Sequence, residues 1–166
     1  MNKKSLLLKN IFFLSLFLFP LTVLPEGVLP PARTLDGITL IPTRNRNDLA
    51  LGLQYVTKMP ENVGILFRDL GQVNSFHSRN CLFTIEITAL DKDGKILQMV
   101  DTLPENDRVK IPEGTRYVIE TNANVMRRKG FKVGNRIEFN SLQKSVNPSL
   151  NLEDHLPRTG GWREKF

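Results

Sequence analysis

The sequence is poor in the residues that build disulfides and metal sites. Its 166 residues include one cysteine, Cys81, and two histidines, His77 and His155. A single cysteine cannot form a disulfide within the chain. These three residues are too few for a zinc site, and "DKDG" at 91–94 lacks the further oxygen ligands of a calcium loop. We therefore expect no metal and no other cofactor, and burial has to stabilise the fold.

The chain also lacks a hydrophobic run long enough for an ordinary transmembrane helix. The apolar stretch "IFFLSLFLFPLTVL" is shorter than the roughly 20 residues that a spanning helix needs, and Ser15 and Pro20 interrupt it. The basic stretch "MNKKSLLLK" precedes it, which is typical of a secretory signal. We predict a signal peptide over residues 1–25 and an exported protein, periplasmic or secreted. The alternative is an uncleaved signal that anchors the chain, and no A-x-A site marks the cleavage position.

Positive charge is modest once this segment is set aside. The whole chain has a net charge of +6, and residues 1–25 carry three lysines and no acids, which leaves 20 basic against 17 acidic residues. The densest basic cluster, "MRRKGFK" at 126–132, lies at a predicted helix end, where the helix dipole favours cations. We expect no nucleic-acid partner, and membrane contact only through an uncleaved signal segment.

Alternating apolar residues and turn signals predict one β-rich domain over residues 38–140. A proline-rich linker precedes it at 26–37, and a polar tail follows it at 141–166. Strands are predicted at 38–42, 64–67, 83–89, 95–101, 116–122 and 136–139, with "DKDG" as a hairpin turn. The predicted fold class is mainly β (β-rich α+β), a small single-domain barrel or sandwich with two short helices.

Capping signals place the two helices. In "NRNDLALGLQY", Asn45 is a favourable N-cap and Asp48 stands three positions later. Gly52 costs about 1 kcal/mol relative to alanine inside a helix, so we expect another segment to approach closely there. The second helix, in "NANVMRRKGF", ends with Gly130 in the left-handed position that follows many helices.

Two short patterns suggest chemistry that we do not expect. His77 and Cys81 stand four positions apart, which in an extended segment means about 13 Å at about 3.3 Å per residue. A nucleophile and its base need about 3 Å, so we predict no catalytic dyad. The string "LPRTG" at 156–160 matches a sortase sorting signal, but the remaining "GWREKF" contains no apolar span that would hold it at a membrane. We interpret that match as chance.

Four polar residues lie in or beside apolar strands: Arg79, Asn80, Glu86 and Glu120. A buried carboxylate needs a hydrogen-bonding or charged partner, or it takes up a proton. Each carboxylate is open to two interpretations, an ordinary surface residue on the outer face of the sheet or a member of a site. The site hypothesis is that Arg79 and a carboxylate, together with Asn80, line one small polar site.

Three stretches of the chain resemble one family in the same order. They are "GLQYVTKMPENVGILF", "SFHSRNCLFTIEITALDKDGKI" and "YVIETNANVMRRKGFKVGNRI". They are similar to the motifs GLM-x-R, G-M-L-F, F-W-M-K-N-T-x-x-P-L-D-I, V-L-E and G-I-x-x-G-D of the family catalogued as domain of unknown function 192. The resemblance covers about residues 38–139, with motif positions at Gly52, Leu53, Gly64, Phe67, Phe76 and Gly134. It implies a small, β-rich, single-domain protein, of a kind that is often exported and has no established activity.

The departures from these motifs bear on the site. Val56 stands at the arginine position of the first motif, and His77 and Cys81 replace a tryptophan and a threonine. Arg79 and Glu86 keep the charges of the lysine and aspartate that the family motif has there. His77 and Cys81 are therefore substitutions of this chain, and the resemblance implies no thiol chemistry.

The functional prediction is an exported, non-catalytic module that binds a small polar ligand or an envelope partner protein near Asn80 and Glu86. Whether it is an enzyme is left open. The first alternative is an envelope hydrolase or lyase that uses Glu86 or Glu120 as general acid or base. The second is a purely structural envelope protein in which Cys81 joins two chains.

Overall fold

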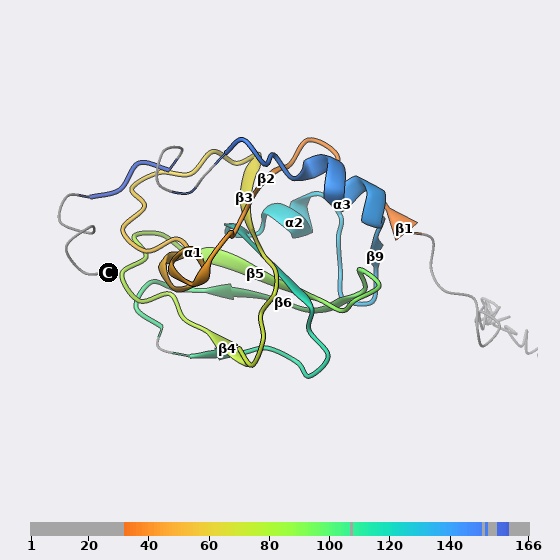
Figure 1. Cartoon of the computed structure of the whole chain (residues 1–166), viewed down its shortest axis with the longest axis horizontal. Helices are drawn as coiled ribbons and strands as arrows, with labels where there is room; N and C mark the ends of the chain where they lie inside the picture. Colours follow the sequence, from red (N-terminus) through yellow and green to blue (C-terminus); the bar gives the residue numbers. More distant parts are fainter. Residues whose placement is uncertain (1–31, 107, 151, 153–155, 160–166) are drawn as a thin grey trace, which may run out of the picture.

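The computed structural model describes residues 32–106, 108–150, 152 and 156–159. These residues form short strands and helices around one central sheet (Figure 1). The strands are β1 Ala32–Arg33, β2 Thr39–Pro42, β3 Val63–Phe67, β4 Ser75–Phe76, β5 Ile85–Leu90, β6 Ile96–Thr102, β7 Val109–Lys110, β8 Tyr117–Asn122 and β9 Arg136–Ile137. The helices are α1 Arg46–Leu51, α2 Val125–Arg128 and α3 Phe139–Ser145. The predicted signal segment, residues 1–25, lies outside the described residues.

The central sheet has the strand order β2-β3-β8-β5-β6. β2 and β3 run parallel, and the other neighbours run antiparallel. Because β2 and β6 form its edges, the sheet is open and does not close into a barrel. Two further pairings, β1 with β9 and β4 with β7, lie outside it. The mainly β, sandwich-like α+β prediction is confirmed, with three short helices in the described part of the chain in place of the predicted two.

Both faces of the central sheet are covered, so all six residues of β5 are buried. The two cores that result are named here after the helices beside them. The α1-side core includes Ile41, Leu53, Ile65, Phe67, Ile87 and Val118. The α2-side core includes Leu40, Leu66, Leu90, Ile119, Met126 and Leu142. Figure 1 shows α2 and α3 close together and α1 apart from them. The predicted alternation along β5 is present, but neither of its faces is open to solvent.

The local signals predicted these elements well. The Asn45 side chain accepts a hydrogen bond from the Asp48 N–H at 2.8 Å and caps α1. Gly130, at φ 80°, follows α2 in the left-handed region, and Gly94, at φ 78°, completes the hairpin turn between β5 and β6. None of the helices in the part of the chain described here is both long enough and apolar enough to span a bilayer.

The predicted linker and tail need correction where the structure describes them. Leu35, in the linker, is 1% exposed, and its N–H donates to the Ser141 hydroxyl of α3 at 2.5 Å. In the tail, α3 buries Leu142, and the separate Leu152 and Leu156 are each 1% exposed in the α1-side core. Leucines at such wide intervals create no periodic pattern, although each one fills a place in a core.

Candidate functional site

A pocket of about 890 Å³ opens on the α1 side of the sheet. Its apolar wall is formed by Leu49, Leu53, Phe67, Leu70, Val73 and Phe76. The polar side chains facing it from the interior include Gln54, His77, Cys81 and Glu120. The pocket therefore combines an apolar wall with polar groups in nearly equal measure, and its concave shape is that of a small-molecule site.

Gly52 brings the end of α1 against the pocket wall. It follows the last helical residue with φ 45°, a conformation that L side chains rarely adopt. A Cβ at this position would lie 3.3 Å from the Phe67 ring and 3.5 Å from Oε2 of Glu120. The close approach predicted from the sequence is therefore present, and it places the α1 terminus beside a carboxyl group.

Glu120 is the buried acid of the pocket. The strand register pairs it with Ile65 of β3 and with Ile87 of β5, so it stands on the central strand of the sheet. Only 3% of the residue is exposed, and no described residue donates a hydrogen bond to its carboxyl group. Burial raises the pKa of Glu120 to about 8. At neutral pH the group is therefore mostly a neutral acid, which offers one donor and one acceptor.

Two phenylalanines form the aromatic part of the wall. The Phe67 and Phe76 ring centroids lie 5.0 Å apart with an interplanar angle of 84°, an edge-to-face arrangement. Phe67 ends β3, and Phe76 belongs to β4, which β7 holds by antiparallel pairing. Both rings line the pocket together with Glu120.

Among the described residues, Asn80 contacts the pocket lining through the Gln54 side chain. The Gln54 side chain donates to the Ala50 carbonyl at 2.7 Å and accepts from the Asn80 side chain at 2.9 Å. The Asn80 N–H donates to the Glu105 carboxylate at 2.9 Å, while its φ of 59° places it in the left-handed region. Asn80 therefore fixes the orientation of a pocket residue.

Cys81 and His77 line the same pocket, which corrects the extended geometry assumed from the sequence. β4 ends at Phe76, and the chain then turns, with the Cys81 N–H donating to the Ser78 carbonyl at 3.1 Å. Burial raises the pKa of the Cys81 thiol to about 12, so it is a poor nucleophile at neutral pH. Cys81 is 3% exposed, and this burial also opposes the alternative in which it joins two chains.

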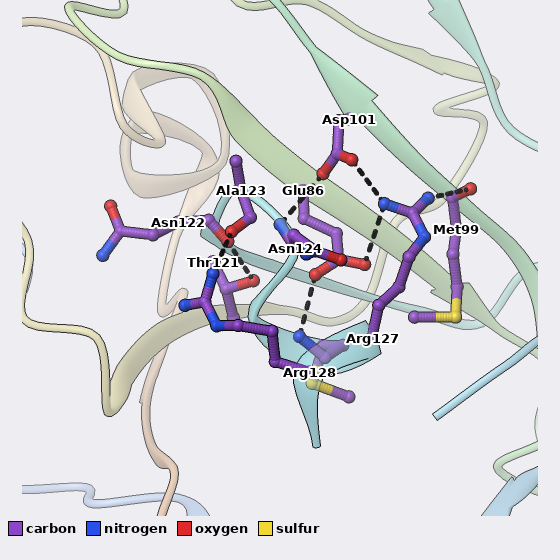
Figure 2. A network of polar contacts seen from close by, with 10 residues as sticks. Glu86, Met99, Asp101, Thr121, Asn122, Ala123, Asn124, Arg127 and Arg128 are labelled. Carbon is purple, nitrogen blue, oxygen red and sulfur yellow. Dashed lines mark hydrogen bonds and ion pairs between the residues drawn. The ribbon is translucent and has the colours of Figure 1, made fainter. Parts of the chain in front are cut away.

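Glu86 belongs to a different network on the α2 side of the sheet (Figure 2). Its Oε2 accepts from the Met126 N–H at 2.8 Å, and its Oε1 lies 3.4 Å from Nη1 of Arg127. The same Arg127 nitrogen contacts Asp101 at 2.5 Å, and the other donates to the Met99 carbonyl at 2.8 Å. Burial raises the pKa of Glu86, whereas the Met126 N–H and Arg127 act to lower it. This network attaches α2 to β5 and β6.

The structure does not bring the four predicted site residues together. Glu86 faces the α2-side core, and Glu120 faces the pocket on the opposite side of the same sheet. Asn80 contacts the pocket residue Gln54, and Arg79 is exposed outside the pocket lining. Within the described residues, no group of three or more His, Cys, Asp or Glu side chains is placed to hold a metal ion.

Sequence reasoning overlooked Gln54 as a site residue and also the C-terminal segment that supports it. Arg158 pairs with Val56 in an antiparallel bridge, and its guanidinium donates to the carbonyls of Gln54 and, at 2.9 Å, of Gly52. The family resemblance places an arginine at Val56, and this chain supplies an arginine from the facing segment. The departure at Val56 was visible in the sequence, but its contact with Arg158 was not, because the two residues lie far apart in the chain.

The same segment contains most of the sortase-like string. Leu156 is 1% exposed, the Pro157 carbonyl accepts from the Thr57 N–H at 2.8 Å, and the Thr159 N–H donates to Tyr55 at 2.8 Å. Gly160 lies outside the described residues. In the folded protein these backbone groups are therefore already paired.

Comparison with known proteins shows a family and a shared fold. The family model described as an uncharacterized ACR, domain of unknown function 192, matches residues 33–139. A solved structure of a putative transcription regulator from Sinorhizobium meliloti 1021 is similar, with TM-score 0.53 and 22% identity over 60% of this chain and 78% of that one. A protein of unknown function from Novosphingobium aromaticivorans DSM 12444 has TM-score 0.53 and 21% identity over 69% of this chain and 95% of that one. At this identity the two structures show the fold alone. No curated protein matches the chain.

Proposed function

Because this chain belongs to the uncharacterized domain of unknown function 192 family, we propose its function from its own pocket: it is a module that binds a small molecule beside α1. The observation that carries this proposal is the buried Glu120 carboxyl group in the pocket wall, which receives no hydrogen bond from any described residue. A buried polar group without a partner costs free energy that a ligand can recover. The protein without ligand is therefore less stable than it would be with this carboxyl group paired, and a ligand that pairs with it gains that free energy.

The dimensions of the pocket agree with this function. Its volume of about 890 Å³ falls in the range of about 300–1,000 Å³ that is usual for small-molecule sites. The buried polar groups Gln54, Cys81 and Glu120 lie on different segments, so a ligand has to satisfy them in one orientation. These properties favour a small ligand over a partner protein.

Binding is favoured over catalysis by the positions of the two carboxylates. The hydrolase or lyase alternative named Glu86 or Glu120 as acid or base. Glu86 is fully buried on the other side of the sheet and already accepts the Met126 N–H. Glu120 lines the pocket, and burial keeps the Cys81 thiol of the same lining protonated. The other acid among the described lining residues is Asp69, which is exposed at the rim, so this lining offers no second buried carboxylate to share the chemistry.

The place of action that we propose is outside the cytoplasm, in the periplasm or the medium. Support comes from the sequence, where the basic and apolar residues 1–25 form the pattern of a secretory signal. The central sheet and the pocket are built from residues after 38, so removal of that signal leaves the proposed binding site complete.

The experiment is a fragment screen by protein NMR on protein produced from the full chain. We expect fragments that shift the backbone amides of Gly52, Leu53 and Phe76, and a loss of affinity of tenfold or more in Glu120→Gln. The matched control is Glu113→Gln, an exposed site away from the pocket. A screen in which no fragment shifts pocket amides, or in which Glu120→Gln binds every hit unchanged, contradicts the proposed function.

A further inference from the structure

We propose that the ligand of this pocket is an organic cation, a protonated amine on an apolar body, with the Glu120 carboxylate as its counter-ion. This inference rests on the proposed function and specifies the chemical class of the ligand. It follows from the charges around the pocket, from the aromatic wall and from the free hydrogen-bonding capacity of Glu120.

The charges of the pocket favour a cation over an anion. Among the described residues that line it, the acids are Glu120 inside and Asp69 at the exposed rim. The basic residues of this lining are Arg46, which is exposed on α1, and the partly buried His77, and the lining includes no lysine. The Arg158 guanidinium lies beside the lining, where it donates to the Gly52 and Gln54 carbonyls. An anionic ligand would bring its charge beside the buried Glu120 carboxyl group, which is costly.

The aromatic wall suits the same class of ligand. The edge-to-face pair places Phe67 and Phe76 beside Glu120 in one pocket. Aromatic ring faces attract organic cations, most strongly where the cation is desolvated. Leu53 and Leu70 add apolar surface for the body of the ligand. A small amine with a hydrocarbon body therefore meets a complementary group at each end.

Binding of such a ligand has to move one proton. The ligand enters as an ammonium ion, the neutral Glu120 carboxyl group releases its proton to water, and an ammonium–carboxylate pair forms. No covalent bond between ligand and protein is made or broken. Because burial raises the pKa of Glu120 to about 8, this proton release takes place across the neutral range. We therefore expect affinity to rise by up to about tenfold per pH unit until pH reaches about 8.

The experiment compares three probes that share a phenyl ring and a short alkyl chain. They are 2-phenylethylamine, 2-phenylethanol and 3-phenylpropionate, titrated by calorimetry into protein made from the full chain at pH 6.5 and 7.5. We expect the amine to bind at least tenfold more tightly than the alcohol, the propionate to bind least, and amine affinity to rise about tenfold between the two pH values. Titration in two buffers of different ionisation enthalpy should show release of close to one proton.

Glu120→Gln is the test variant, with Glu113→Gln as its matched control. We expect the first to lose the preference for amine over alcohol and its pH dependence, and the second to keep both. If Glu120→Gln does not fold, the two-buffer titration of the unmodified protein decides by itself. Equal binding of amine and alcohol, or binding without proton release, overturns the inference and leaves the proposed function intact. If none of the three probes binds, the hits of the NMR fragment screen decide. Amine hits support this inference, and neutral or anionic hits overturn it. The absence of any hit overturns both this inference and the proposed function.

Discussion

Glu86 and Glu120 are the same side chain in two opposite environments, separated by the thickness of one sheet. In the register of β5 and β8, Glu86 pairs with Thr121, and Glu120 pairs with Ile87. Neighbouring positions on a strand point to opposite faces. Glu86 therefore meets the Met126 N–H and Arg127, while Glu120 meets a pocket wall. Glu86 is paired within the protein through its Oε2 hydrogen bond and its ion pair with Arg127, although its Oε1 accepts no hydrogen bond, and Glu120 is available to a ligand.

The raised pKa of Glu120 predicts that the protein loses stability as pH rises. Between the usual value of 4.5 and the folded value of about 8, the folded state holds a proton that the unfolded state has released. The free energy of unfolding therefore falls with rising pH over this range, by up to about 1.4 kcal/mol per pH unit. We expect Glu120→Gln to remove this slope and to be more stable than the unmodified protein at pH 8 by about 4 kcal/mol. Urea unfolding of both proteins at pH 4.5, 6 and 8 measures this difference in the free energy of unfolding.

The Gln variant also serves as its own control at low pH. Near pH 4.5 the Glu120 carboxyl group is neutral in the folded protein, so the two proteins should differ by less than about 1 kcal/mol there. Parallel stability profiles for the two proteins between pH 4.5 and 8 would contradict a buried, proton-holding Glu120.

For Glu86 we expect the opposite of the gain in stability predicted for Glu120→Gln. Removing the Glu86 side chain should destabilise the protein, because its partners lie within the protein. Glu86→Ala leaves the Met126 N–H without its acceptor and removes the ion pair with the half-exposed Arg127. We expect the free energy of unfolding to fall by about 3 kcal/mol, and hydrogen exchange of α2 amides to become faster. Glu113→Ala, at an exposed position, should change it by less than about 0.5 kcal/mol. A loss below 1 kcal/mol in Glu86→Ala would show that the network does not hold α2.

At this scale the sequence predicted the charged residues but not their surroundings. It identified Glu86 and Glu120 as carboxylates inside apolar strands. Alternation along each strand assigns faces within that strand, but pairing Glu120 with Ile87 requires the register between β5 and β8. The hypothesis of one polar site was therefore wrong for Glu86 and Glu120, because the register between β5 and β8 places them on opposite faces of the sheet.

At the scale of elements, the C-terminal segment acts as a support for the turn after α1. Arg158 donates to the carbonyls of Gly52 and Gln54, and both of these residues line the pocket. Carbonyl groups at a helix end have no partner within the helix and need donors from elsewhere. A residue about one hundred positions away along the chain provides these donors.

Arg158→Ala tests this support. We expect the free energy of unfolding to fall by about 2 kcal/mol, since two hydrogen bonds from a charged donor are lost. The Thr57 amide, which donates to Pro157 at 2.8 Å, should exchange at least tenfold faster with solvent. Arg108→Ala is the matched control, because Arg108 is exposed and lies outside this contact. Unchanged exchange at Thr57 would show that the segment is held without Arg158.

The elements themselves were predictable to the extent that their signals are local. Asn45, Gly94 and Gly130 act through neighbouring backbone groups, and their roles follow from the sequence. α3 and Leu156 pack in cores formed by distant residues, so no local pattern in the sequence indicates that they are buried. The packing of the tail and the surroundings of Glu120 were therefore missed for the same reason, because both depend on contacts between residues far apart in the sequence.

For the whole molecule, the two cores are the two sides of a single sheet. β3, β5 and β8 contribute residues to both cores. Unfolding of these strands on the pocket side would therefore also expose the α2-side core to solvent. The family match begins at residue 33 and the described strands begin at Ala32. The residues that carry the predicted signal pattern thus precede every described residue of these two cores.

Export is the prediction that belongs to this scale. We expect the full chain, made in a Gram-negative host, to be recovered from the periplasmic fraction with its new N-terminus between residues 25 and 32. That range follows the apolar run and precedes the first described strand, so a signal peptidase would reach it without opening the sheet. Intact mass and N-terminal sequencing measure the position. Replacing Leu14 and Leu16 by arginine interrupts the apolar run and should leave the chain in the cytoplasmic fraction at full length. An unmodified chain of 18.9 kDa found in the membrane fraction would favour the anchored alternative, and one found in the cytoplasm would contradict export while leaving the pocket and its ligand to be tested independently.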